Sequence, residues 1–165
     1  MGKVYIGKNP IEFADEIALQ SQDRSSRAGC FIVNTNLKNS DRLISIGYNK
    51  LSKGFDVNDD KNHERPFKYK IFLHAEINAI TSAAKMGVSI LGATMYLNWF
   101  PCSNCALAIV NSGISELHCD EEPDWTSNDH WIEDQALALD ILKRGDVKIV
   151  YDNYKVKNRI VNDNK

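Results

Sequence analysis

Two short segments of this sequence carry side chains that could bind a metal ion and move protons. His74 and Glu76 stand close together, and Cys102 and Cys105 follow in the segment 101–105. One imidazole and two thiolates are good zinc ligands, and three protein ligands leave the fourth tetrahedral position open for water, as in catalytic zinc sites. Glu76 is not needed as a ligand, so its carboxylate can act as a general acid and base. The pattern therefore indicates hydrolysis with zinc-activated water.

Only the fold can bring the two segments together, because residues 75–101 separate them. Cys102 and Cys105 are three positions apart at the expected start of a helix, so their side chains share one face of it. A helix N-terminus also stabilises negative charge, which favours thiolates. His74 stands at the start of another expected helix. Two neighbouring helices whose N-termini point at one spot would assemble the site.

A structural zinc site is the alternative interpretation. Structural sites normally have four protein ligands, and His63 or Cys119 could in principle supply the fourth. Glu76 would then be an ordinary acidic residue in the first turn of a helix. A chain that binds no metal is a third possibility, but the count of three good ligands favours the catalytic site.

The apolar residues predict alternating helices and strands over a single domain, residues 1–165. We expect helices from Pro10 and over 74–86, 102–111 and 129–144, and strands at 30–33, 43–47, 94–97, 114–119 and 147–151. This alternation indicates an α/β domain in which helices cover a central sheet. The polar stretch 50–70 shows no period and predicts a functional or mobile loop. The polar tail from about residue 152 is expected to be loosely held.

Composition and charge restrict the classes of function. Hydrophobic residues make up 43% of the chain and charged residues 25%, as in an ordinary globular protein. The net charge of −2 gives no sign of a basic surface, so a nucleic-acid partner is not expected. No apolar run is long enough to cross a membrane, and the first ten residues contain no signal-peptide core. The four cysteines do not form a secreted disulfide pattern, which predicts a cytoplasmic protein.

Taken together, these motifs resemble the cytidine deaminase superfamily, and specifically its deoxycytidylate (dCMP) deaminase branch. The order H-x-E and then P-C-x-x-C is the signature of zinc-dependent base deaminases. The likeness covers most of residues 10–150. It rests on five segments, which are Ser21–Asp23 leading into Cys30, the G-Y-N motif Gly47–Asn49, the K-Y pair Lys68–Tyr69, His74–Ile80 and Phe100–Ala106.

The resemblance implies a three-layer, cytidine-deaminase-like α/β fold with a central mixed sheet of about five strands. It implies that His74, Cys102 and Cys105 hold Zn²⁺ and that Glu76 shuttles protons. It also implies hydrolytic deamination of a free cytosine nucleotide, most directly dCMP to dUMP and ammonia, by a homo-oligomer. Its partner would be a small-molecule nucleotide. Deamination of cytidine, of guanine or of a tRNA adenosine remains open as an alternative.

Several residues around these motifs are expected to contact the substrate. The resemblance implies Asn49 as a contact to the sugar or phosphate. Backbone groups at Ala75, Phe100 and Pro101 would orient the base. Trp99 could wall the base pocket or pack in the core, since an aromatic ring suits either place.

The phosphate of a nucleotide would need cationic partners. The related sequences usually continue G-Y-N-G-x-P, whereas Lys50 and Ser52 stand here in place of the glycine and the proline. Lys50 adds a positive charge near a possible phosphate. The candidates for phosphate contact are Arg24, Arg27, Lys50, Lys53, Arg65 and Lys68, although each could equally be a solvated surface charge.

Overall fold

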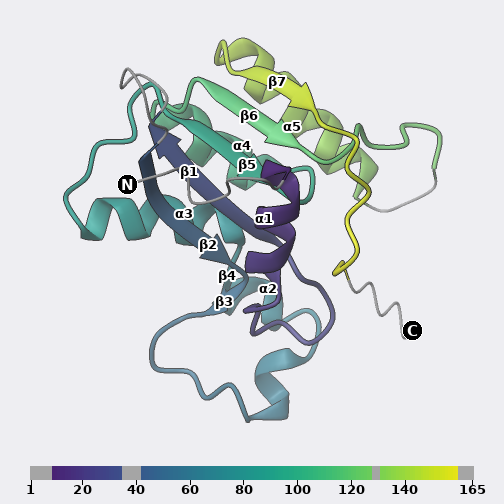
Figure 1. Cartoon of the computed structure of the whole chain (residues 1–165). Coiled ribbons are helices and arrows are strands. Elements are labelled where there is room, and N and C mark those ends of the chain that lie inside the picture. Colours follow the sequence, from purple (N-terminus) through teal and green to yellow (C-terminus); the bar gives the residue numbers. More distant parts are fainter. Residues whose placement is uncertain (1–8, 35–41, 128–130, 160–165) are drawn as a thin grey trace.

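The computed structural model describes residues 9–34, 42–127 and 131–159, and a five-stranded mixed sheet forms its centre (Figure 1). The sheet has the order β2–β1–β5–β6–β7. Strand β1 runs antiparallel to β2 and β5, whereas β6 pairs in parallel with β5 and β7. The strands are β1 (Gly29–Asn34), β2 (Arg42–Tyr48), β5 (Thr94–Leu97), β6 (Glu116–Cys119) and β7 (Lys148–Tyr151).

Helices cover both faces of this sheet. They are α1 (Pro10–Ala18), α3 (Ala75–Lys85), α4 (Ser103–Asn111) and α5 (Ile132–Arg144). Figure 1 shows α1 on one face and α3, α4 and α5 on the other. The predicted three-layer α/β fold with a mixed five-stranded sheet is confirmed. The expected helix over 129–144 begins at Ile132, and residues 128–130 lie outside the described part of the chain.

The polar stretch 50–70 holds more local structure than the sequence predicts. It contains β3 (Lys50–Leu51), the 3-10 helix η1 (Asp60–His63) and the start of α2 (Lys68–Ile71), and β3 pairs antiparallel with β4 (Phe72–Leu73). Asn62 is buried and donates its side-chain amide to the carbonyl of Asp56 at 2.8 Å. Side-chain to backbone bonds of this kind fix a segment without an apolar period, which is why the pattern of apolar residues did not reveal it.

Strand β2 packs directly against the start of α3. A Cβ atom at Gly47 would lie 2.1 Å from the carbonyl oxygen of Ala75 and 2.6 Å from the amide nitrogen of Ala79. Only glycine permits this approach of strand and helix. Ser45 strengthens the contact, since its hydroxyl donates to the carbonyl of Ala79 at 2.9 Å. The position of α3 over the sheet is therefore fixed within a narrow range.

The tail, which the sequence predicts to be loosely held, makes hydrogen bonds to the rest of the protein over residues 152–159. Two buried carboxylates accept its backbone N–H groups. Asp120 accepts from Lys155 at 2.8 Å and from Val156 at 3.1 Å. Asp15 accepts from Lys157 at 2.9 Å and from Asn158 at 3.2 Å. A polar tail sequence gives no sign of this anchoring because most of the donors are main-chain groups.

We predict that Asp15→Asn lowers the free energy of unfolding by about 2 kcal/mol. Both carboxylate oxygens of Asp15 accept hydrogen bonds, Oδ1 from Asn98 and Oδ2 from the tail. An asparagine side chain has only one oxygen, so its NH₂ group would face a donor on the other side and that hydrogen bond would be lost. Asp140→Asn makes the same chemical change on an exposed face of α5 (Ile132–Arg144), where Asp140 pairs with the exposed Arg144, and is the control. Denaturant unfolding at pH 7 measures both variants. Equal midpoints for the two would show that the tail contributes nothing to stability.

Candidate active site

The expected metal ligands lie at the N-termini of two neighbouring helices. His74 is the N-cap residue of α3 and Cys102 is the N-cap residue of α4, and neither side chain caps its own helix. Cys105 follows within the first turn of α4 and is buried. Helices α3 and α4 pack against each other. The predicted arrangement, with two helix N-termini directed at one spot, is confirmed.

The three ligand side chains have the spacing of a zinc site. Nδ1 of His74 lies 3.4 Å from Sγ of Cys102 and 3.5 Å from Sγ of Cys105. A tetrahedral zinc with ordinary Zn–S and Zn–N bonds would place such atoms about 3.6 Å apart. Within the described ranges no other His, Cys, Asp or Glu side chain joins this group. The geometry therefore fits three protein ligands and an open fourth position.

Neither proposed fourth ligand of a structural zinc site reaches the cluster. Nε2 of His63 lies 2.8 Å from the carbonyl oxygen of Val57, and its ring packs near Phe72. Cys119 lies on β6 and is fully buried in the core of the sheet. These placements disfavour the structural alternative, because such a site requires a fourth protein ligand.

Mutual hydrogen bonding sets the protonation state of each of the three ligands. The hydrogen bond from Cys105, helped by His74, lowers the pKa of Cys102 to about 4. The hydrogen bond to Cys102 raises the pKa of His74 to about 9 against the effect of burial, and the same thiolate raises the pKa of Cys105. A metal needs thiolates and a neutral imidazole, so its binding displaces the protons held by His74 and Cys105.

Glu76 lies beside this cluster without belonging to it. Its side chain is 4% exposed, in the first turn of α3 and facing the same cavity as His74 and Cys102. Burial raises the pKa of the Glu76 carboxyl, and the charge of His74 opposes the shift. A carboxyl with a raised pKa near an open metal position is suited to accept and return a proton.

Side chains from other elements cap the two ligand-bearing helices. Oδ1 of Asn49 accepts the N–H of Ala75 at 3.2 Å, and Oδ2 of Asp134, on α5, accepts the N–H of Ser103 at 2.9 Å. These bonds satisfy N–H groups that helix starts leave unpaired. Because the caps come from elsewhere, His74 and Cys102 are free to bind a metal.

A cavity of about 520 Å³ opens above the cluster, within the usual range for small-molecule sites. His74, Glu76 and Cys102 lie in its wall. Its aromatic lining comes from Tyr69, Phe72, Trp99, Phe100 and Trp131. Its polar lining comes from Asp23, Ser25, Ser26, Asn49, Arg65, Lys68 and Gln135.

The structure brings some expected substrate contacts to this cavity and not others. Asn49, Trp99 and Phe100 line it, and Trp99 also packs against the core. Ala75 and Pro101 are fully buried behind the lining, so a contact through their backbone groups stays a prediction. Lys50 is exposed on β3 and does not line the cavity, because pairing with β4 turns Leu51 inward and Lys50 outward.

The family described as "Cytidine and deoxycytidylate deaminase zinc-binding region" matches residues 8–120, which include all three ligand side chains and Glu76.

The chain belongs to this deaminase family. Zinc is accordingly the metal that the His74, Cys102 and Cys105 cluster fits.

The chain is also similar to two named proteins. A protein of Aliivibrio fischeri named as an uncharacterized deaminase in the luxG 3′ region is 31% identical over 87% of this chain and 91% of its own length. The deoxycytidylate deaminase of Mus musculus is 36% identical over 61% of this chain. The match covers 56% of the mouse enzyme, so this chain spans only a little over half of that relative.

A solved structure shows the same fold. The dCMP deaminase of cyanophage S-TIM5, crystallised with dCMP and dUMP, superposes with a TM-score of 0.65 over 92% of this chain and 99% of its own. Its sequence identity of 22% makes this a likeness of fold. Within the described residues, no helix of this deaminase has the length and apolar character needed to span a membrane.

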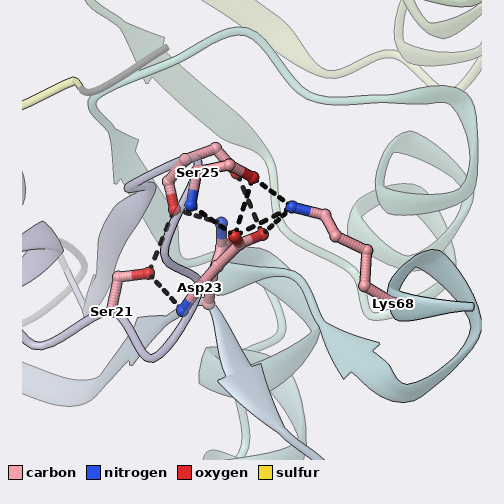
Figure 2. Close-up of polar contacts among 6 residues, drawn as sticks. Ser21, Asp23, Ser25 and Lys68 are labelled. Atoms are coloured by element: carbon pink, nitrogen blue, oxygen red, sulfur yellow. Dashed lines mark hydrogen bonds and ion pairs between the residues drawn. The ribbon is translucent and has the colours of Figure 1, made fainter. Parts of the chain in front are cut away.

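Motif reading did not predict a buried ion pair in the cavity wall of this deaminase. Nζ of Lys68 donates to both carboxylate oxygens of Asp23, at 2.8 and 2.9 Å, and contacts Oγ of Ser25 (Figure 2). The two side chains of the pair are only 4% and 7% exposed. Ser25 and Ser26 also donate to Asp23, so several groups from one turn converge on the carboxylate.

The ion pair outweighs the effect of burial on Asp23. Burial disfavours the charged carboxylate, but hydrogen bonds from Lys68 and Ser25 leave the pKa of Asp23 below its usual value. The same turn also contacts Asn49, whose side-chain amide donates to the carbonyl of Ser26 at 3.3 Å. Asn49 in turn caps α3. Asp23 and Lys68 therefore support the start of the helix that carries His74 and Glu76.

Sequence reading also missed Tyr69, Trp131 and Gln135 as lining residues. Tyr69 and Trp131 face each other edge to face, with ring centroids 6.2 Å apart. Tyr69 belongs to the K-Y motif, which was a usable signal. Trp131 and Gln135 lie after residue 120, beyond the matched family region, and no motif marks them.

We predict that Asp23→Asn or Lys68→Met alone lowers the free energy of unfolding by about 3–5 kcal/mol, because each leaves a buried charge without its partner. The double variant should lose less than the sum of the two. Arg24→Gln is the control, since its ion pair with Asp60 is exposed (52% and 85%), and we expect little change from it. Urea unfolding at pH 7 provides the comparison.

The same pair sets a pH dependence. Because the folded-state pKa of Asp23 is lowered, its contribution is complete above the unfolded-state value of about 3.9 and is lost as the pH falls through the folded-state value. The gap in stability between the wild type and Asp23→Asn should therefore narrow below about pH 4. A gap that stays constant from pH 7 to pH 3 would show that the ion pair does not form.

Proposed function

We propose that this chain is a deoxycytidylate deaminase, which hydrolyses dCMP to dUMP and ammonia. The observation that carries the proposal is the group of one imidazole and two thiols with an open fourth position, beside the buried carboxyl of Glu76, in the wall of a cavity of about 520 Å³. Three protein ligands with a free carboxylate are the parts that hydrolytic deamination of a base requires.

The relatives support this choice of substrate. The mouse protein that matches over 61% of this chain is a deoxycytidylate deaminase. The structure of similar fold from the cyanophage holds dCMP and dUMP. Both similarities support a cytosine nucleotide as the substrate of this chain.

The reaction needs one metal and one proton carrier. We assign zinc to His74, Cys102 and Cys105, where it would lower the pKa of water toward neutrality and so supply a nucleophile at physiological pH. Glu76 takes a proton from the attacking water and delivers it to N3 of the cytosine ring. It then carries the second water proton to the amino group. The bond from C4 to that nitrogen breaks, ammonia leaves, and C4 keeps the water oxygen as a carbonyl.

The aromatic walls of the cavity position the base. Phe100 precedes the cysteine segment and Trp99 precedes Phe100, so both rings are fixed by the strand end that leads to Cys102. Aromatic faces of this kind bind a planar base by stacking. The burial of Glu76 strengthens its electrostatic interactions with the reacting atoms.

The proposal also covers the cellular compartment, the class of substrate and the oligomeric state. All four cysteines are free, which supports a reducing compartment such as the cytoplasm. The net charge of −2 supports a free nucleotide rather than an RNA substrate. A single domain and a homo-oligomeric state remain predictions.

We predict that Glu76→Gln lowers kcat for dCMP by about 10²–10⁴-fold, because the amide cannot carry the proton. Zinc content, measured by atomic emission, should stay at the wild-type level, because Glu76 is not a ligand. His74→Ala should instead lose zinc. Glu133→Gln, an exposed residue of α5 outside the cavity lining, is the matched control and should leave kcat unchanged.

Ammonia release from a panel of dCMP, CMP, dCTP, deoxycytidine, guanine and adenosine tests the substrate. We expect dCMP to have the highest kcat/KM. A zinc-loaded protein that acts only on guanine or adenosine would replace the proposed substrate and keep the hydrolytic site. Activity retained by Glu76→Gln at the wild-type level would overturn the proposed mechanism itself.

A further inference from the structure

We infer that Arg65 is the residue that recognises the 5′-phosphate of the nucleotide and that Lys68, the other cation of the cavity, does not. This inference rests on the proposed function. It concerns which of two cationic side chains in the same cavity wall sets the preference for a nucleotide over a nucleoside.

The structure reduces the cationic candidates to two. Of the six that the sequence offers, only Arg65 and Lys68 line the cavity. Arg24 is paired with Asp60 on the exposed loop, and Lys50 faces away on β3. Arg159, a cation of the tail, lies over the Trp99 ring and donates to the carbonyl of Asn98, outside the lining.

Lys68 has no donor left for a ligand. An ammonium group has three N–H donors. Figure 2 shows the three contacts that take them, two to the oxygens of Asp23 and one to Oγ of Ser25. A phosphate could bind Lys68 only by displacing Asp23, which would leave a buried carboxylate unpaired at a high cost in free energy.

Apart from Arg65, the groups that line the cavity carry no net positive charge that could balance a phosphate. Lys68 and Asp23 cancel each other. A zinc dication and the two thiolates also sum to zero, and an ionised Glu76 adds one negative charge. Within the described lining, Arg65 is therefore the single cation whose charge no neighbouring group neutralises.

The position of Arg65 suits an anion that enters from solvent. Its side chain is exposed, it forms no ion pair with a described carboxylate, and its guanidinium lies 5.9 Å from the centre of the Tyr69 ring. Tyr69 itself faces Trp131 across the cavity wall. A guanidinium presents a planar pair of N–H groups that matches two phosphate oxygens. The base would then lie toward Glu76 and the phosphate toward the Arg65 side.

Steady-state kinetics on dCMP and deoxycytidine test the inference, because the two substrates differ only in the phosphate. We expect Arg65→Gln to lower kcat/KM for dCMP by about 10–100-fold, mainly through KM, and to leave deoxycytidine unchanged. Arg65→Lys should lose less, since it keeps the charge but not the paired donors. Lys61→Gln removes one charge from the same exposed segment without touching the cavity, and is the control.

The variant Lys68→Met distinguishes the role of Lys68 from that of Arg65. We expect it to lower kcat/KM for both substrates by similar factors, because Lys68 acts through the fold. A loss confined to dCMP in Lys68→Met, or equal kinetics of Arg65→Gln and wild type on dCMP, would overturn the assignment of Arg65 while leaving the deaminase intact. A wild-type enzyme that deaminates deoxycytidine but not dCMP would overturn both the assignment and the proposed substrate. Activity on neither compound would remove the proposed function and the inference with it.

Discussion

The adjacent N-termini of α3 and α4 are the constraint on which the site depends. Each helix begins at a residue whose side chain must bind a metal and so cannot cap its own helix. Asn49 and Asp134 supply the caps from β2–β3 and α5 instead. Gly47 lets α3 approach β2 closely enough to fix His74 relative to the sheet. The sheet and the helices on one of its faces together set distances of 3.4 and 3.5 Å between the imidazole nitrogen and the two sulfurs.

The charges in the cavity wall are arranged around the same Asn49 cap of α3. Lys68 and Asp23 form a closed ion pair whose serine turn bonds to Asn49, so a buried charge pair stabilises the cap of α3 without offering charge to a ligand. Buried charges are tolerated when every donor and acceptor is satisfied, as they are here. Under our proposal, recognition of the substrate phosphate falls to Arg65, an exposed residue in the cavity lining.

Sequence alone predicts much of this arrangement, for identifiable reasons. The starts of α3 and α4 follow from the pattern of apolar residues and from the chemistry of helix ends. The convergence of His74 with Cys102 and Cys105 is expected from their chemistry as zinc ligands, because only the fold brings the two segments together. The pairing of Lys68 with Asp23 does not follow from the sequence, because 45 positions separate them and a lysine is usually solvated. Nor does the anchoring of the tail, since most of the tail donors to Asp15 and Asp120 are main-chain groups that any sequence would offer. Trp131 and Gln135 reach the cavity only through the packing of α5 beside α4.

Zinc K-edge X-ray absorption on the purified protein is the most direct test of an open, three-ligand metal site. The account predicts two sulfur atoms at about 2.3 Å, and one imidazole nitrogen with one further light atom at about 2.0–2.1 Å. The Glu76→Gln protein should give the same spectrum. A second imidazole, a third sulfur, or a change of ligand set on replacing Glu76 would contradict the account, because each would mean that the fourth position is filled by the protein.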